Sequence, residues 1–277
     1  MNIYSYAKIN LSLTVNSKQK NSLHEIQTYF CLIDLADKIK IIKTKETKDK
    51  IIFKGKFVKF INKKNNSIIN LLGILRRLKL ISSYYSVKVT KNIPVFAGLG
   101  GGTSNAAFIL KYLFRKKINK NLFNELKSDI GSDIALFFKK QGFMKNLKSI
   151  IGLKKKNFYF VLIQPKIRCS TKDIYSRVKK FSKKKQLNKK IINSKNRFLT
   201  YLSNSTNDLQ FVVERKHPSI KKLLKDIKSE RGCHFSRMTG SGSVCYGLFD
   251  HKIIAKKALN KLKKKYPKFW ISLAKTV

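Results

Sequence analysis

Apolar and polar residues alternate strictly near the start of the chain. Between Ala7 and Val15 every second side chain is apolar, and Lys8 and Asn10 are among the polar residues between them. A period of two is typical of a strand that buries one face. Apolar runs predict further strands at residues 26–35, 38–44, 85–90, 158–165 and 269–274, and a strand, a glycine turn and a second strand at residues 233–249.

Elsewhere the apolar residues are spaced three or four apart, which predicts helices. One helix begins at Ile68, and Ser67 before it is a suitable N-cap. We expect others after the glycines near residue 100 and at residues 121–127, 171–181, 207–215, 218–229 and 252–265. Strands and helices are mixed without strict alternation, so the predicted fold class is α+β. We place one domain at residues 1–150 and a second at residues 151–277.

The composition excludes a chain that is disordered throughout, because 43% of its 277 residues are hydrophobic. Lys and Arg number 62 against 14 Asp and Glu, a formal charge of +48. The basic residues are spread along the chain, apart from residues 179–197, which we interpret as a solvated loop or insertion. This spread favours a compositional bias toward lysine over a dedicated nucleic-acid surface, so we expect no specific nucleic-acid partner.

Cysteine spacing and hydropathy indicate the cellular compartment of the protein. The four cysteines lack the C-x-x-C spacing of metal or redox sites: Cys31, Cys169, Cys233 and Cys245. No apolar run approaches the roughly 18 residues of a membrane span, and Lys8 interrupts any signal-type segment. We therefore expect a cytoplasmic protein with reduced thiols and no membrane partner.

The strongest chemical signal is a glycine-rich loop that leads into an apolar helix. The segment from Pro94 to Asn105 reads PVFAGLGGGTSN, with four glycines in five positions. Glycines let backbone N–H groups approach a ligand, and the positive N-terminus of the following helix points at the same place. The loop therefore predicts a phosphate site. It lacks the G-K-[ST] of a P-loop and the third glycine of a dinucleotide fingerprint.

This loop resembles the ATP-binding motif of the superfamily of galactokinase, homoserine kinase, mevalonate kinase and phosphomevalonate kinase, the GHMP kinases. Four more segments resemble motifs of that family and follow its order: Tyr6–Leu11, His24–Thr28, Gly131–Ile134 and Met238–Ser243. The resemblance implies an N-terminal α+β domain related to the second domain of a ribosomal protein. It also implies a ferredoxin-like C-terminal domain.

The same resemblance implies an ATP-dependent kinase, with Mg²⁺ accompanying ATP through ligands that we leave unassigned. The residues expected at ATP are Pro94, Val95, Phe96, Ala97, Gly98, Leu99, Gly100, Gly101, Gly102, Thr103, Ser104 and Asn105. Three residues are expected near the adenine: Asn66, Ser67 and Lys91. The fuller form of the loop is similar to that of the members that phosphorylate the 2-hydroxyl of 4-diphosphocytidyl-2-C-methyl-D-erythritol.

Phosphoryl transfer requires a base for the alcohol and charge to hold the phosphates. On the resemblance, Asp133 is the expected base, and Lys8 keeps that carboxylate charged and orients the hydroxyl. Taken alone, Asp133 could equally cap a helix. The expected substrate-binding residues are Asn10, His24, Thr171, Tyr175, Gly240, Ser241 and Gly242. We expect a monomer or a weak homodimer.

Two segments depart from the family pattern, and the first concerns the substrate. Leu23 precedes His24 where members usually carry an aromatic ring that stacks on cytosine, and the segment KNLKSIIG lacks the usual G-[IV]-G-E. Two alternatives stay open: a sibling kinase for homoserine or mevalonate, and a basic RNA-binding protein that kept the fold and lost the activity.

Overall fold

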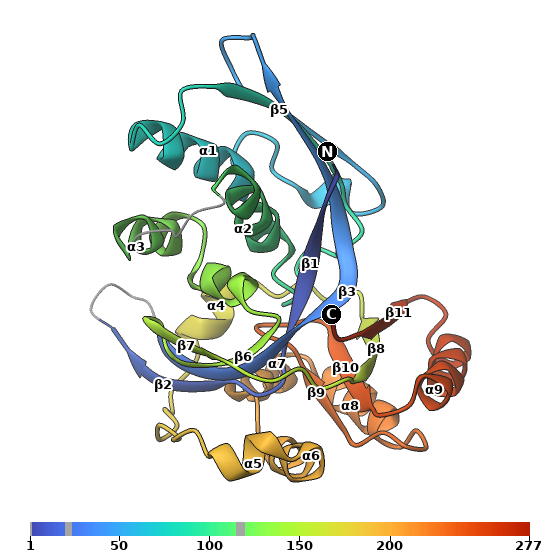
Figure 1. Cartoon of the computed structure of the whole chain (residues 1–277). Helices are drawn as coiled ribbons and strands as arrows, with labels where there is room; N and C mark the ends of the chain where they lie inside the picture. The colour runs from blue at the N-terminus through green and yellow to red at the C-terminus, as the bar shows by residue number, and fades with distance from the viewer. Residues whose placement is uncertain (1, 20–23, 115–119) are drawn as a thin grey trace. The chain divides into compact units, whose positions relative to one another are not determined.

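The computed structural model describes residues 2–19, 24–114 and 120–277 and consists of two compact units (Figure 1). Unit 1 comprises Met1–Lys8, Leu35–Val95 and Gly100–Lys139, and unit 2 comprises Ile9–Asp34, Phe96–Leu99 and Lys140–Val277. Each unit is therefore assembled from several segments. The boundary near residue 150 between two consecutive sequence domains stays a prediction.

Unit 1 contains a sheet covered by helices. Strand β5 (Tyr84–Thr90) pairs antiparallel with the second half of β3 (His24–Thr44) and parallel with β4 (Lys50–Lys54), and β1 (Asn2–Asn10) also pairs with β3. The core forms because alternate residues of β3 and β5, among them Ile39 and Val87, are fully buried. The remaining elements are η1 (Val58–Phe60), α1 (Ser67–Arg77), α2 (Gly101–Leu113), α3 (Lys120–Asp129) and the 3₁₀ helix η2 (Ser132–Phe138).

Unit 2 contains an antiparallel sheet in the order β11-β8-β10-β9. Its strands are β8 (Tyr159–Gln164), β9 (Phe235–Met238), β10 (Cys245–Phe249) and β11 (Trp270–Lys275). The first half of β3 pairs with β2 (Thr14–Lys18) and β6 (Gln141–Asn146), and β6 pairs with β7 (Ser149–Gly152). The helices are α4 (Thr171–Ser176), α5 (Lys189–Asn193), α6 (Lys195–Ser203), α7 (Asp208–Lys216), α8 (Pro218–Lys228) and α9 (Lys252–Lys265).

The α+β class is confirmed, but three predicted strands have different bounds. The strand expected from Ala7 to Val15 is interrupted between β1 and β2, because the N–H groups of Leu11 and Ser12 both donate to the carbonyl of Tyr29. The next N–H, that of Leu13, donates to Thr206 instead. The two strands expected at residues 26–35 and 38–44 form the single strand β3, because the backbone stays extended through the polar residues between them.

Three helical expectations also need correction. The N-cap of α1 is Asn66, whose Oδ1 accepts from the N–H groups of Ile68 and Ile69, so Ser67 is the first helical residue. Helix α4 ends at Ser176, well short of residue 181. The stretch 179–197 is a loop only in its first part, because α5 and the start of α6 lie within it and bury Ile192.

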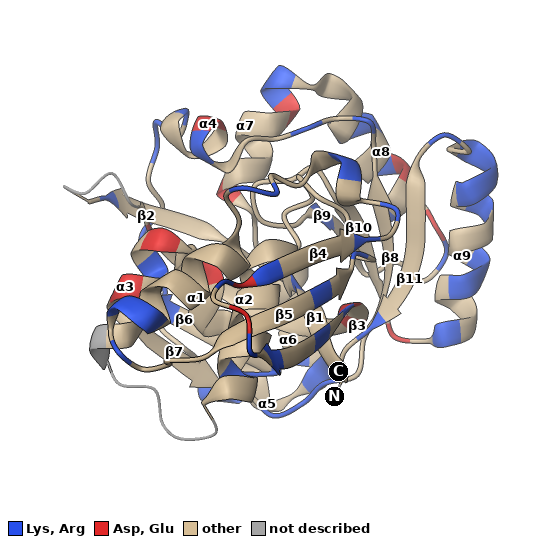
Figure 2. Ribbon diagram, turned by 90° about the horizontal axis from the view of Figure 1, so that it is seen from above, with Lys and Arg blue, Asp and Glu red and all other residues tan. Residues whose placement is uncertain are grey.

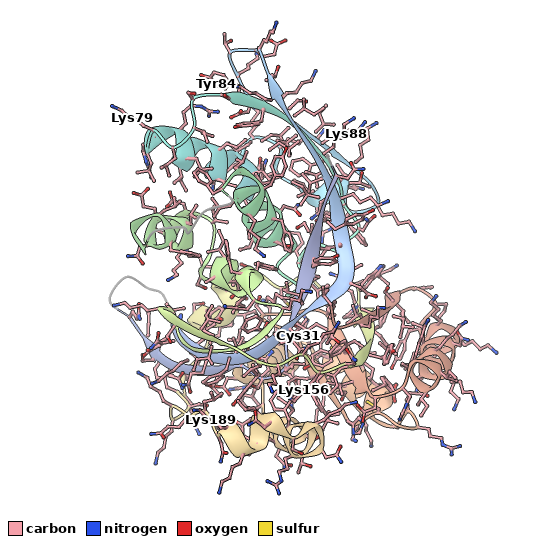
Figure 3. The ribbon with its side chains drawn as sticks, viewed as in Figure 1. Cys31, Lys79, Tyr84, Lys88, Lys156 and Lys189 are labelled. Atoms are coloured by element: carbon pink, nitrogen blue, oxygen red, sulfur yellow. The ribbon has the colours of Figure 1, made fainter. Side chains whose placement is uncertain are left out.

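Lysine and arginine residues are spread along helices and strands of both units (Figure 2). Lys79, Lys88 and Lys189 are exposed, whereas Cys31 and Lys156 are buried (Figure 3). The ammonium group of Lys156 lies 5.2 Å from the centroid of the Phe198 ring. In the part of the chain that the structure describes, no helix combines the length and the hydropathy that crossing a membrane would require.

Candidate active site

An ion pair joins the two residues expected to carry the chemistry. Lys8 is on β1 and Asp133 is in the first turn of η2, both in unit 1, and Lys8 Nζ lies 2.9 Å from Asp133 Oδ2. The side chain of Lys8 is 3% exposed, whereas that of Asp133 is 29% exposed. The carboxylate therefore has a charged partner on its buried side and still reaches solvent.

The helix η2 holds Asp133 through its own backbone and through a lysine of α2. The N-cap of η2 is Gly131, at a φ of +136° that L side chains rarely adopt, so Asp133 is not the cap. At the other end of η2, the ammonium of Lys111 donates to the carbonyl of Phe137. Burial lowers the pKa of Lys111 to about 8. These contacts connect α2 directly to the helix that carries the carboxylate.

The glycine-rich loop passes closely over Lys8. Gly100 is the N-cap of α2 with a φ of +69°, and its carbonyl accepts the Ser104 N–H at 2.8 Å. A Cβ at Gly100 would lie 2.9 Å from Phe137 Cζ and 3.3 Å from Lys8 Cε. The close approach therefore requires glycine. No side-chain cap covers the N-terminus of this 13-residue helix, whose positive dipole end suits an anion.

Ser104 and Asn105 fix the start of α2 against β1. Ser104 Oγ donates to the carbonyl of Tyr6 at 2.6 Å and lies 2.7 Å from Ser5 Oγ. Ser5 Oγ in turn donates to Asn105 Oδ1 at 2.9 Å, and both loop residues are buried. Their side-chain oxygens thus bind the protein itself. A direct contact of these side chains with phosphate or Mg²⁺ stays a prediction.

Two of the three residues expected near adenine lie at the first turn of α2. A Cβ at Gly102 would lie 3.1 Å from Ser67 Oγ, and one at Gly101 would lie 3.3 Å from Lys91 Nζ. Lys91 forms a buried ion pair with Asp37, a residue that the sequence analysis did not select. The sequence could have indicated Asp37 through the scarcity of acidic residues. Where Asp and Glu are so few, each of them is a candidate for a specific role.

The residues expected at the substrate, with Phe96–Leu99 of the loop, lie in unit 2. Gly98 packs on the second glycine turn, since a Cβ there would come 2.0 Å from the Thr239 carbonyl. Ser241 Oγ of that turn lies 2.9 Å from Oγ1 of Thr171, the first residue of α4. Gly240 and Gly242 of the turn have positive φ angles. The Asn10 side chain is buried and donates to Thr28 Oγ1 at 2.9 Å.

An aromatic cluster surrounds His24. The rings of Tyr175 and Phe181 lie 5.1 and 6.5 Å from the His24 ring, centroid to centroid. Burial and then the charge of Lys18 lower the pKa of His24 below its ordinary value. Leu23, the departure noted in the sequence, lies outside the described residues. Phe181 was not predicted from the sequence, because this residue is embedded in the lysine-rich stretch.

The fold and this site define a kinase of the GHMP class. The chain matches the family models "GHMP kinases N terminal domain" over residues 66–141 and "GHMP kinases C terminal" over residues 184–268. A crystal structure of 4-(cytidine 5'-diphospho)-2C-methyl-D-erythritol kinase aligns with a TM-score of 0.73 at 23% identity, covering 99% of both chains. A homoserine kinase from Cytophaga hutchinsonii also reaches 0.73, at 16% identity over 100% of this chain and 94% of that one.

Sequence relatives narrow the class further. The chain is 38% identical to the 4-diphosphocytidyl-2-C-methyl-D-erythritol kinase of Pelagibacter ubique, over 99% of this chain and 98% of the relative. It is 30% identical to the kinase of the same name from Caldanaerobacter subterraneus, over 100% of this chain and 97% of the relative. The chain belongs to the 4-diphosphocytidyl-2-C-methyl-D-erythritol kinase family. The family resemblance and the two-domain fold expected from the motifs are thereby confirmed.

Proposed function

We propose that this chain transfers the γ-phosphoryl group of ATP to the 2-hydroxyl of 4-diphosphocytidyl-2-C-methyl-D-erythritol, a step in isoprenoid precursor synthesis. The observation that carries the proposal is the Lys8–Asp133 ion pair under the glycine-rich loop of a chain that belongs to this kinase family. Phosphoryl transfer needs little covalent chemistry from the protein, and a base, a cation and a phosphate cradle are the parts it does need.

Asp133 accepts the proton of the 2-hydroxyl. As that O–H bond breaks, the alcohol oxygen bonds to the γ-phosphorus, and the bond from this phosphorus to the bridging oxygen of ADP breaks. Lys8 balances the charge of the carboxylate at 2.9 Å and orients the incoming hydroxyl. Because Lys8 is almost fully buried, its charge acts through protein more than through water, which strengthens the interaction.

The phosphates of ATP bind at the N-terminus of α2. Backbone N–H groups from Gly100 to Thr103 are the donors, since the Ser104 N–H already bonds to the Gly100 carbonyl and the side-chain oxygens of Ser104 and Asn105 bond to β1. Asn66, Ser67 and Lys91 are assigned to the adenine side, and Pro94–Leu99 lead into the loop. Among the described residues no group of three or more His, Cys, Asp or Glu could hold a resident metal. Mg²⁺ accompanies ATP, and its protein ligands stay unassigned, because a magnesium ion bound to substrate phosphates needs only one or two carboxylates.

The cytidine part of the substrate is assigned to residues of unit 2. Tyr175 offers the ring for stacking beside His24, and Asn10, Thr171 and the turn Gly240–Gly242 supply polar contacts. Cytosolic location and a monomeric or weakly dimeric state belong to the same proposal and rest on the sequence alone.

An assay of ATP consumption tests the function. It compares the cytidyl substrate with homoserine and mevalonate, in the wild type and in Asp133→Asn. We expect turnover with the cytidyl substrate only, and a loss of about 10²- to 10⁴-fold in Asp133→Asn, the range for removal of a general base. Turnover of a sibling alcohol at a comparable rate would overturn the substrate assignment. Turnover by Asp133→Asn within threefold of wild type would overturn the assignment of the base.

A second assay isolates the cytidine contacts. Tyr175→Ala should weaken binding of the cytidyl substrate by about tenfold or more, because stacking of a base on an aromatic ring contributes roughly 1–3 kcal/mol. Leu23→Tyr should tighten it by restoring a ring. The KM for ATP should stay the same in both variants. Unchanged substrate binding in Tyr175→Ala would contradict the stacking role.

A further inference from the structure

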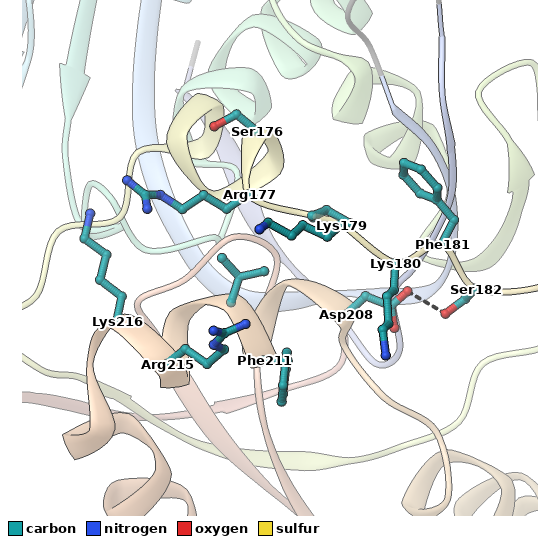
Figure 4. Close-up of a pocket in the computed structure, with 12 residues that line it drawn as sticks. Ser176, Arg177, Lys179, Lys180, Phe181, Ser182, Asp208, Phe211, Arg215 and Lys216 are labelled. Atoms are coloured by element: carbon teal, nitrogen blue, oxygen red, sulfur yellow. Dashed lines mark hydrogen bonds between the residues drawn. The ribbon is translucent and has the colours of Figure 1, made fainter.

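A pocket lies within unit 2, and none of the residues that line it is assigned to the kinase reaction. Its volume is about 820 Å³, and it lies between α7 and the segment Ser176–Ser182, which we call the strap (Figure 4). That volume is within the range of pockets for small ligands.

One face of α7 lines the pocket and packs against no core. Asp208, Phe211, Val212, Arg215 and Lys216 all line it, at the spacing of a single helical stripe. The residues of α7 that enter the core, Leu209 and Val213, lie on the other side of the helix. The Phe211 side chain is 65% exposed. The helix thus presents a large ring to solvent in the middle of a concave, partly apolar surface.

Hydrogen bonds and ion pairs fix the strap at both ends. At one end Asp208 Oδ2 accepts from Ser182 Oγ and from the Val15 N–H, both at 2.8 Å. At the other end Asp173 of α4 accepts from Arg177 Nε at 2.8 Å and pairs with Lys216 Nζ at 3.1 Å. The strap therefore passes over α7 and is held at Ser182 by the hydrogen bond that Figure 4 marks, with exposed ion pairs of Asp173 at its other end.

The lining of the pocket is strongly cationic. It contains five basic residues: Arg177, Lys179, Lys180, Arg215 and Lys216. Arg177 and Lys216 already pair with Asp173, so Lys179, Lys180 and Arg215 carry the excess of positive charge. The single carboxylate in the lining, that of Asp208, already accepts the two hydrogen bonds that fix the strap. Opposite an apolar floor that contains Phe211 and Val212, this excess of positive charge selects a ligand with a flat apolar part and several negative charges.

We propose that this pocket is a further nucleotide site, separate from the ATP loop and from the cytidyl site assigned to Tyr175 and His24. The base stacks on Phe211, beside which Arg215 holds its guanidinium 5.9 Å from the ring centroid, and the phosphates bind the basic residues of the rim. The uncharged polar side chains of the lining are those of Ser176 and Ser182, and both hydroxyls already donate to the protein, to Asp173 and Asp208, so few groups remain to read the edges of the base. Affinity therefore depends on the number of phosphates and hardly on the identity of the base.

Fluorescence titration of Phe211→Trp in the full chain tests the site. The chain has one natural tryptophan, Trp270, so the wild type supplies the background signal. We expect ADP and GDP to quench the new tryptophan with dissociation constants within about threefold of each other. AMP should bind at least about fivefold more weakly, and adenosine should produce no saturable change at the same concentrations.

Calorimetry with ADP then separates this site from the ATP loop. Wild type should show two classes of site. Phe211→Ala and Arg215→Ala should each weaken one class by about fivefold or more, the low end of the range for base stacking, with the KM for ATP unchanged. The matched control is Ile253→Ala with Lys256→Ala on α9, which removes an exposed apolar residue and a cation elsewhere. The control should keep both classes.

Three results would overturn the proposal. One is a single class of ADP sites in the wild type together with no quenching in Phe211→Trp. A second is an equal loss of binding in the control, which would show general attraction to a basic protein. A third is quenching by a single-stranded oligonucleotide but by no mononucleotide, which would make the pocket part of an RNA surface. All three leave the kinase assay unaffected, so they are distinguishable from a failure of the proposed function.

Discussion

Two buried lysines of unit 1 form ion pairs that differ in one decisive respect. The Lys91 and Lys8 side chains are both 3% exposed, but Asp37 is fully buried whereas Asp133 is open to solvent. Asp37 also accepts the N–H groups of Asn92 and Ile93, at 2.7 and 2.9 Å. The first carboxylate therefore serves the fold, and the second is accessible for chemistry.

Asp37→Asn should lower the free energy of unfolding by about 3–5 kcal/mol, because it leaves the ammonium of Lys91 buried without a countercharge. Urea denaturation followed by circular dichroism measures the change. Asp133→Asn is the matched variant, and it should lower the same free energy by clearly less, since its carboxylate is partly solvated. Equal losses in the two variants would contradict the distinction between the pairs.

At the scale of elements, the spacing of apolar residues predicted the helices and strands that form from local interactions. It missed elements that depend on partners distant in the sequence. The bounds of α9 agree with the expected residues 252–265 because its apolar residues keep a regular helical spacing. Strands β4, β6 and β7 were missed because each is short and depends on its partner strand. Helices α5 and α6 were missed because α5 buries a single residue, Ile192, and α6 begins inside the lysine-rich stretch.

The same distinction holds for the candidate site. Motifs identified Lys8, Asp133 and the glycine-rich loop, since their residue types recur in a fixed order. The partner of Lys91 could not be predicted, because Asp37 is 54 residues away and only tertiary structure brings it close. Phe181 likewise becomes visible only when the strap is folded beside His24.

Gly100→Ala should lower kcat while the protein still folds. The added methyl group would meet Phe137 and Lys8 at 2.9 and 3.3 Å and would occupy a φ of +69°, so the loop or the lysine must move. Gly73→Ala in α1 is the control, because nothing lies within 4 Å of its Cβ. It should raise the free energy of unfolding by roughly 0.5–1 kcal/mol, the helix preference of Ala over Gly, with kcat unchanged. Wild-type kcat in Gly100→Ala would show that the loop tolerates the displacement.

At the scale of the whole molecule, the charge of +48 has a testable signature. If a general lysine bias explains it, binding to RNA should be independent of sequence and should fall steeply with salt, disappearing near physiological ionic strength. Filter binding with unrelated RNAs at several salt concentrations measures this. Tight, sequence-selective binding in physiological salt would instead support the RNA-binding alternative.

Buried thiols should make stability fall at alkaline pH. Burial raises the pKa of Cys31, Cys233 and Cys245, that of Cys233 to about 11, from an ordinary value of 9.0. Above pH 9 the unfolded chain loses these protons while the folded chain keeps them. Each thiol then lowers the free energy of unfolding by up to about 1.4 kcal/mol per pH unit until its folded pKa is reached. Lys111 and Lys156, whose pKa values burial lowers, act in the opposite direction.

Urea denaturation between pH 8 and pH 10.5 measures this slope. Cys245→Ala should show a shallower decline than the wild type, because one buried thiol no longer titrates. The comparison cancels groups common to both proteins, including tyrosines whose pKa burial also raises. Identical slopes in the two proteins would show that the Cys245 thiol titrates alike in the folded and unfolded chains.

The interleaving of the two units also has a consequence for synthesis. All segments of unit 1 lie before residue 140, whereas unit 2 needs Ile9–Asp34 together with residues up to β11 near the end of the chain. At a translation rate of about 5–20 residues per second, residues 9–34 wait roughly 10 to 50 s for the last of their partners. Throughout that interval the apolar side chains of Leu11, Leu13, Ile26 and Phe30, all buried in the finished protein, stay uncovered on the ribosome. This early segment is therefore where a chaperone that attends nascent chains should bind.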